Sequence, residues 1–322
     1  MNPILKKLIA VSNQRVIVPF YHKVSDEKPT FEKSLYPSRK IAEFKNDIDV
    51  LSNYFNPISM KEFIEISKSK DELNQNYFHL TFDDGLSNFY KIVAPILKER
   101  NIPATVFINS DFVDNKALFF RYKASLLFQV YEKSSVKCKK VFHDFFEGKE
   151  AIEEILFAIN YNNKHILDEL ANAVNYSFEE YLETEKPYLS SIQINELIDT
   201  GFTVGAHSKS HALYADISFK EQVNQTKESM DWLVHKFNLD DRFFSFPFTD
   251  LDVSKEFFTK LSEEKIIDIS FGTSGIKKDN IETNFQRIPF EIGNTNAEDY
   301  LLKEYMKYFL KIPFKKNKIH RN

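Results

Sequence analysis

The sequence predicts an α/β fold in which parallel strands form a sheet, either open or closed. Short apolar runs alternate with amphipathic runs along most of the chain, which is typical of strand–helix–strand units. The run 77–82 is apolar almost throughout, as expected for a strand buried on both faces. Residues 112–188 carry helix formers and aromatic residues without strand signals, which indicates a helical insertion.

Strands are expected where a short run is rich in β-branched and aromatic side chains. Such runs lie at residues 15–22, 77–82, 104–110, 202–208, 243–248, 266–273 and 285–290. The carboxyl ends of parallel strands lie at one edge of a sheet or one mouth of a barrel, where the active sites of such folds form. Polar residues that follow these strands are therefore the candidates for chemistry.

Helices are expected between the strands because apolar residues recur there every three or four positions, as they do within 42–55. Gly201 is a suitable stop for the helix 191–201. Thr295, three residues before Glu298, resembles a capping box that opens the last helix. The other expected helices are 88–101, 117–133, 150–159, 218–237 and 296–310.

Composition and charge exclude several classes of protein. A chain of 322 residues with 43% hydrophobic content can build a large core, and one domain over 1–322 with the insertion at 112–188 is expected. The formal net charge of -4 gives no basic footprint for nucleic acid. The single cysteine, Cys138, excludes an internal disulfide and a cysteine-based zinc site. No stretch approaches a membrane span or an apolar signal core, so a cytoplasmic location is expected.

Two adjacent carboxylates, Asp83 and Asp84, directly follow the apolar run LTF and precede a glycine. Neighbouring carboxylates resist ionising together unless a cation or a donor compensates them, and a bound metal ion is one remedy. The segment AHSKSH offers further ligands, because His207 and His211 are four residues apart. Two histidines and one carboxylate leave coordination positions open, which suits a catalytic ion that holds water and a substrate oxygen.

Each of these motifs has a simpler interpretation when it is taken alone. DDG is a frequent turn sequence, because aspartate and glycine both suit turns. Two histidines four residues apart are common on helix surfaces. Their occurrence after separate strands of one predicted sheet, together with His22 at the end of the first strand, favours chemistry.

TFDDG followed by HSxSH resembles the polysaccharide deacetylase family of NodB-like carbohydrate esterases. The resemblance covers the chain except for the insertion and the C-terminal tail, and it implies a distorted (β/α) barrel. It also implies that Asp83 is the catalytic base. Asp84, His207 and His211 correspond to the residues that hold the metal ion in this family. Zn²⁺ is the default ion, and Co²⁺, Ni²⁺ or Fe²⁺ suits the same ligands.

The resemblance assigns roles to two residues late in the chain. The backbone N–H of Phe248, in SFPFTD, corresponds to the donor that stabilises the oxyanion, although the usual following glycine is Thr249 here. The alternative is a plain hydrophobic strand with a terminal turn. Arg287, in FQRIPFE, resembles the arginine that orients the base, and the alternative is a surface arginine on an edge strand.

The family's late histidine, its general acid, has no clear counterpart, because beyond residue 235 the only histidine is His320. His22, in FYHKV, instead resembles the N-terminal Tyr-His acid of the branch that acts on poly-N-acetylglucosamine-like glycans. An imidazole titrates near working pH, as an acid catalyst must. The alternative is that His22 only packs at a strand end. Tyr21, Asp250 and Glu291 are noted as cleft residues without a role.

The resemblance implies a metal-dependent hydrolase of non-peptide C–N bonds that removes N-acetyl groups from the amino sugars of a glycan. The alternatives are a deacetylase of a nucleotide- or lipid-linked sugar precursor, a non-catalytic glycan-binding relative, and a non-haem iron oxygenase. The expected partner is an N-acetylated glycan or sugar, and not nucleic acid. The basic C-terminal tail is expected to be solvated, with peripheral contact to an anionic membrane as the alternative.

Overall fold

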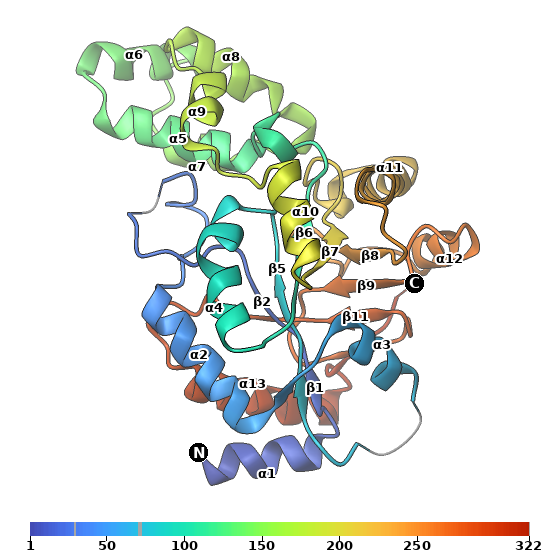
Figure 1. Cartoon of the computed structure of the whole chain (residues 1–322). Coiled ribbons are helices and arrows are strands. Elements are labelled where there is room, and N and C mark those ends of the chain that lie inside the picture. Colours follow the sequence, from blue (N-terminus) through green and yellow to red (C-terminus); the bar gives the residue numbers. More distant parts are fainter. Residues whose placement is uncertain (29, 70–72, 322) are drawn as a thin grey trace.

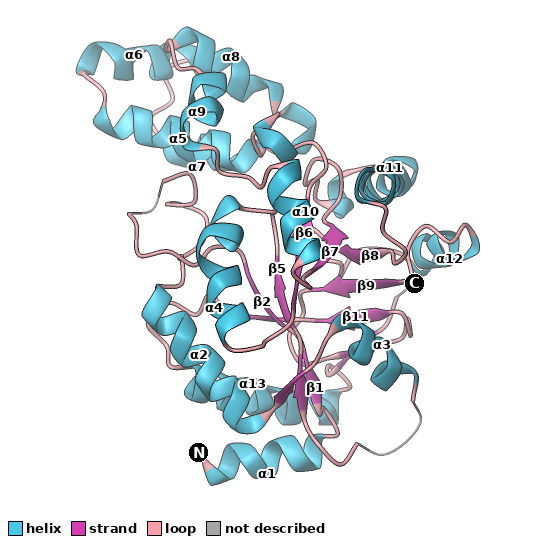
Figure 2. Cartoon of the chain, viewed as in Figure 1, coloured by secondary structure: helices cyan, strands magenta, loops and turns pink. Residues whose placement is uncertain are grey.

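The computed structural model describes residues 1–28, 30–69 and 73–321, and a parallel sheet lies at its centre (Figures 1 and 2). The strands are β2 (Pro19–Tyr21), β5 (Leu80–Phe82), β6 (Ala104–Ile108), β7 (Thr203–Ala206), β8 (Phe243–Ser245), β9 (Ile269–Gly272), β11 (Asn284–Gln286) and β12 (Ile288–Pro289). Their order is β11-β9-β8-β7-β6-β5-β2-β12, and every neighbouring pair is parallel. The predicted α/β barrel is therefore confirmed.

The barrel closes at Arg287. The predicted strand 285–290 is interrupted there, and its two halves pair with strands at opposite edges of the sheet. β11 pairs with β9, whereas β12 pairs with β2. The N–H of Arg287 donates to the carbonyl of Gly272. The N–H of Ile288 then donates to the carbonyl of Val18, so the chain passes from one edge of the sheet to the other. The predicted strand 285–290 is thus two short strands.

The predicted strands 15–22 and 77–82 are also divided, and their first halves form a small parallel sheet outside the barrel. This sheet contains β1 (Val16–Ile17), β4 (Tyr77–Phe78) and β3 (Asn56–Pro57). His79, between β4 and β5, is buried and has a structural environment. Its ring nitrogens lie 2.7 Å from the carbonyl oxygen of Ile58 and 2.8 Å from the hydroxyl of Thr105.

Helices surround the barrel and cover it with their apolar faces. They are α1 (Pro3–Ser12), α2 (Ile41–Tyr54), α3 (Met60–Lys68), α4 (Ala94–Glu99), α10 (Ser191–Asp199), α11 (Phe219–Phe237), α12 (Lys255–Glu263) and α13 (Ala297–Lys311). In α2 the side chains at helical spacing, Phe44, Ile48 and Leu51, are buried. The short helices α1, α3 and α12 were not among the predicted elements. None of the helices in the described ranges has the length and hydropathy needed to span a bilayer.

The predicted capping box of the last helix is wrong. Asn296 caps α13, because its side chain accepts a hydrogen bond from the N–H of Glu298 at 2.8 Å. The carboxylate of Glu298 instead accepts hydrogen bonds from the N–H of Asn2 and the hydroxyl of Tyr54. A partner far away in the sequence thus replaces the local contact that Thr295 was expected to make.

Helices α5 to α9 form a lobe at the top of Figure 1. Their bounds are α5 (Phe120–Lys133), α6 (Val136–Phe145), α7 (Ile152–Ala158), α8 (His165–Ala173) and α9 (Phe178–Glu185). The lobe has its own cluster of buried apolar side chains, which Phe31 and Leu86 join from outside the helices. The division into one domain with an insertion at 112–188 stays a prediction.

The C-terminal segment is not simply a solvated tail. β13 (Lys318–Ile319) pairs in parallel with β10 (Lys278–Asp279). Arg321 is buried, and its guanidinium forms ion pairs with Asp250 and Asp279. The prediction of a solvated tail is wrong for these last residues, because their acidic partners lie far away in the sequence. A buried cation between two carboxylates thus anchors the segment.

Candidate active site

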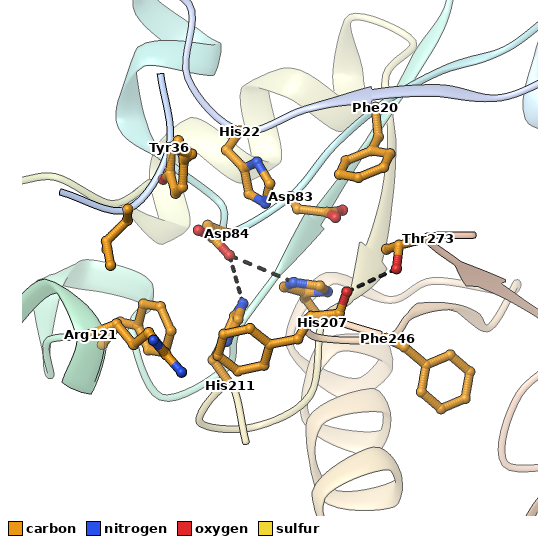
Figure 3. Close-up of a pocket in the computed structure, with 13 residues that line it drawn as sticks. Phe20, His22, Tyr36, Asp83, Asp84, Arg121, His207, His211, Phe246 and Thr273 are labelled. Carbon is orange, nitrogen blue, oxygen red and sulfur yellow. Dashed lines mark hydrogen bonds and ion pairs between the residues drawn. The ribbon is translucent and has the colours of Figure 1, made fainter. Parts of the chain in front are cut away.

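All the predicted site residues except Arg287 line one pocket, which has a volume of about 340 Å³ and is drawn in Figure 3. This volume lies within the range of small-molecule sites. His22 follows β2, and Asp83 and Asp84 follow β5. His207 follows β7, and Phe248 lies beyond β8. The pocket is lined by Phe20, His22, Leu35, Tyr36, Asp83, Asp84, Phe119, Arg121, His207, His211, Phe246, Phe248 and Thr273.

Asp84, His207 and His211 form a buried cluster in this pocket. Nε2 of His211 lies 3.1 Å from Oδ1 of Asp84, and Nε2 of His207 lies 3.6 Å from the same atom. One ligand atom from each residue lies within 4.8 Å of the other two. Nδ1 of His207 lies 2.8 Å from the carbonyl oxygen of Ser245. Nδ1 therefore donates to that carbonyl, which leaves Nε2 as an acceptor facing Asp84.

The cluster fits a divalent metal ion. Within the described residues, the buried Oδ1 of Asp84 accepts no hydrogen bond of normal geometry, and Nδ1 of His211 has no partner. Buried polar atoms are nearly always satisfied, so two unsatisfied atoms in one cluster of possible ligands are what an ion-binding site would show. Burial lowers the pKa of His207 to about 4, which keeps the ring neutral, as a metal ligand must be. Two imidazoles and one carboxylate are a donor set for Zn²⁺ and similar ions.

Tyr122, at the start of α5, binds the other oxygen of Asp84. Its hydroxyl donates to Oδ2 of Asp84, and the hydroxyl of Tyr36 lies 2.5 Å from that of Tyr122. Burial raises the pKa of both tyrosines, so both remain neutral donors. Burial alone would raise the pKa of Asp84, but His211, His22 and His207 together outweigh it and hold the pKa below its usual value. Sequence reasoning missed Tyr122, because no local pattern connects it with Asp84.

Arg287 holds Asp83 by two parallel hydrogen bonds. Nη1 and Nη2 of the guanidinium lie 2.8 Å and 2.7 Å from the two carboxylate oxygens. Nη2 also donates to the hydroxyl of Ser245 at 2.6 Å. Burial would raise the pKa of Asp83, but the charge and hydrogen bonds of Arg287, together with His207 and His22, outweigh it and lower this pKa. Arg287 is fully buried, so the alternative of a surface arginine is wrong.

His22 is paired with Glu291. Nδ1 of His22 lies 2.6 Å from Oε2 of Glu291, and Oε1 accepts hydrogen bonds from the backbone N–H groups of His22 and Lys23. Burial lowers the pKa of His22, but the charge and hydrogen bond of Glu291 outweigh it, so the pKa rises to about 9. His22 is therefore protonated at neutral pH and can donate a proton. Sequence analysis gave Glu291 no role.

Three residues of the site have left-handed backbone angles. The φ angles are 69° for Asp84, 58° for His211 and 57° for Phe248. Such angles cost non-glycine residues about 1–2 kcal/mol each, and they cluster at functional sites. The N–H of Phe248 donates no hydrogen bond within the residues that the structure describes, whereas its carbonyl accepts one from Thr273 at 2.8 Å. A free backbone donor in this pocket is the kind of group that stabilises an oxyanion.

The glycine after the two aspartates has a steric reason. Gly85 has a φ of 61°, and a Cβ atom there would lie 2.8 Å from Cγ2 of Ile108. A larger residue would push the turn away from β6. Gly85 therefore lets Asp83 and Asp84 follow the strand at close packing.

In enzymes with parallel barrels, the active site lies at the carboxyl ends of the strands. The ionisable residues of this chain gather at that place, so the fold and the site are those of a barrel enzyme. The family model described as polysaccharide deacetylase matches residues 70–262, and the chain belongs to this family. At the level of the enzyme class, the chain is therefore a carbohydrate deacetylase. No curated protein matches the chain significantly.

Several solved structures share the fold. The Streptococcus pyogenes deacetylase PplD, in complex with acetate, is 14% identical with a TM-score of 0.58, over 89% of this chain and 96% of that chain. IcaB from Ammonifex degensii is 14% identical with a TM-score of 0.57, and the match covers 91% of this chain and 97% of that chain. A de-N-acetylase from Aggregatibacter actinomycetemcomitans is 14% identical with a TM-score of 0.53, over 89% and 99%. At these identities the likeness shows the fold alone.

Proposed function

We propose that this protein is a metal-dependent hydrolase that removes the N-acetyl group from an amino sugar of a glycan. The products are acetate and a free amine. The observation that carries the proposal is a buried Asp–His–His cluster beside an arginine-held aspartate in one pocket. Among the similar structures are a deacetylase solved with acetate and a de-N-acetylase, which supports an acetyl amide as the bond that is cleaved.

The proposed metal ligands are Asp84, His207 and His211. A divalent ion, when bound, polarises the acetamide carbonyl and lowers the pKa of a water molecule. Zn²⁺ is the default, and Co²⁺, Ni²⁺ or Fe²⁺ suits the same donors. Tyr122 orients Asp84, and the carbonyl of Ser245 fixes the tautomer of His207.

The other residues of the pocket supply the proton transfers. Asp83 is held as a carboxylate by Arg287, and it accepts the proton of the attacking water. The N–H of Phe248 donates to the oxygen on which negative charge develops. His22, protonated because of Glu291, gives its proton to the amide nitrogen, so that the C–N bond breaks and the amine leaves neutral.

The test is release of acetate from N-acetylated oligosaccharides and from nucleotide- and lipid-linked sugars, before and after treatment with a chelator. We expect the chelator to abolish release and a divalent ion to restore it. Asp83→Asn is expected to keep the metal and lose activity by about 100-fold or more, because the general base is removed. The exposed Asp240 provides a matched control, Asp240→Asn, with normal activity expected.

Other results would favour the other functions. Binding of glycans without any release of acetate would indicate a non-catalytic relative. Oxygen consumption with iron would indicate an oxygenase. Normal turnover by Asp83→Asn would remove this residue from the role of base.

A further inference from the structure

Arg121 is a cation in the wall of the pocket, and it is paired with no carboxylate among the described residues. It lies at the start of α5 and lines the pocket together with the Asp–His–His cluster (Figure 3). Its guanidinium forms no hydrogen bond or ion pair with any residue that the structure describes, although its Nε is buried. Asp216 attracts it without contact. The buried arginines of the chain differ from Arg121, because each is paired with a carboxylate: Arg39, Arg287 and Arg321.

An unpaired, partly buried guanidinium is unfavourable unless something compensates the lost hydration. Cation–π contacts with aromatic rings compensate part of this lost hydration. Cζ of Arg121 lies 5.3 Å from the ring centre of Phe248 and 5.9 Å from that of Phe120. Stacking on rings leaves the N–H groups at the edge of the guanidinium free. Arg121 is therefore held in place while its donors remain available to a ligand.

The position of Arg121 is close to the expected reaction. The ring of Phe248 that it contacts lies 4.7 Å from the ring of His211, so a single aromatic side chain separates Arg121 from the cluster. The first turn of α5 has no acidic residue, and its N-cap, Phe119, provides no side-chain hydrogen bond. The positive end of this helix dipole adds to the charge of the guanidinium. The electrostatic field on this side of the pocket therefore favours an anion.

We propose that Arg121 binds an anionic group of the substrate, a carboxylate or a phosphate, on the reacting sugar or on its neighbour. The inference rests on the proposed deacetylase function and specifies its substrate class as an anionic N-acetylated glycan. The fork of guanidinium donors matches the paired oxygens of both groups. A neutral polymer of N-acetylglucosamine offers Arg121 no such partner.

The test compares kcat/KM for three tetrasaccharides. They are neutral N-acetylglucosamine, N-acetylglucosamine alternating with glucuronate, and N-acetylglucosamine with 6-phosphate groups. We expect at least one anionic substrate to exceed the neutral one by about tenfold or more, and the better of the two identifies the anion. The ratio of kcat/KM for the anionic substrate to kcat/KM for the neutral one measures the preference. Arg121→Gln is expected to reduce this ratio by about 10- to 100-fold, as for the loss of charge-assisted hydrogen bonds. Arg121→Lys is expected to retain part of it, because the charge remains but the fork is lost.

The control is Lys133→Gln, which removes one positive charge from an exposed position in the last turn of the same helix. Its ratio is expected to match that of the wild type. A second measurement needs no variant: the preference of the wild type for the anionic substrate is expected to fall as salt is added, because the pairing is screened.

Equal kcat/KM for neutral and anionic substrates would overturn the inference and leave the deacetylase function intact. So would an equal loss for all three substrates in Arg121→Gln, because that pattern indicates structural damage alone. Release of acetate from none of the three, nor from any other N-acetylated sugar, would reject the proposed function and this inference with it.

Discussion

The barrel and the helical lobe contribute to the pocket in different ways. On the barrel side, Asp83 belongs to a network of side-chain hydrogen bonds. Its other members are Arg287, Ser245 and Thr81. The lobe provides Tyr122, which touches a candidate metal ligand, and Arg121, which has no partner among the described residues. Under the proposed function, the barrel holds the general base, whereas the lobe orients one metal ligand through Tyr122 and selects an anionic substrate through Arg121.

The largest effect is expected in the barrel. Arg287→Ala would leave Asp83 buried without its counter-ion, so we expect the free energy of unfolding to fall by about 3–5 kcal/mol. Activity should fall as well, because the pKa of Asp83 rises when the arginine is absent. Denaturant unfolding monitored by circular dichroism measures the first effect. A variant as stable as the wild type would show that this network is not what holds the barrel together.

A smaller effect is expected from the lobe. Tyr122→Phe removes the hydroxyl that donates to Asp84, and such outer contacts typically change metal affinity by about 10- to 100-fold. Competition with a coloured chelator measures the affinity for Zn²⁺. Tyr176→Phe, elsewhere in the lobe, is the matched control and is expected to bind the ion normally. Equal affinities for the two variants would mean that the lobe does not adjust the cluster.

The smallest effect concerns the mouth of the barrel and appears as a shift in pH dependence. Glu291→Gln removes the carboxylate that stabilises the imidazolium of His22, so the pKa of His22 falls from about 9 toward its ordinary value. The acid form is then lost at lower pH, and the alkaline limb of kcat/KM should move down by about one pH unit or more. Glu183→Gln, an exposed carboxylate of the lobe, serves as control. An unmoved limb would contradict the role of His22 as the acid.

Much of the site was accessible from the sequence, because its residues stand directly after strands. Parallel strands bring their carboxyl ends together, so Asp83, Asp84 and His207 had to meet once the barrel was predicted. The contacts of Tyr122 and Glu291 were not accessible, because each joins residues far apart in the chain without a repeating pattern. These contacts depend on packing in three dimensions, which hydrophobic spacing does not encode.

The limits of the fold prediction have the same origin. Apolar runs located the barrel strands, but they did not show that residues 285–290 cross from one edge of the sheet to the other. The crossing is a consequence of closure, and closure is a property of the whole sheet. The run of lysines before residue 318 likewise suggested solvent, while the carboxylates that bind Arg321 lie in distant segments.

The ion pairs of Arg321 with Asp250 and Asp279 also affect the order in which the protein folds during its synthesis. Asp250, which Arg321 binds, stands only two positions beyond Phe248, on the same loop. During synthesis on the ribosome that loop is made about seventy residues before its counter-ion emerges. The loop that carries Phe248 therefore gains its ion pair at Asp250 only after the last residues of the described chain have been made.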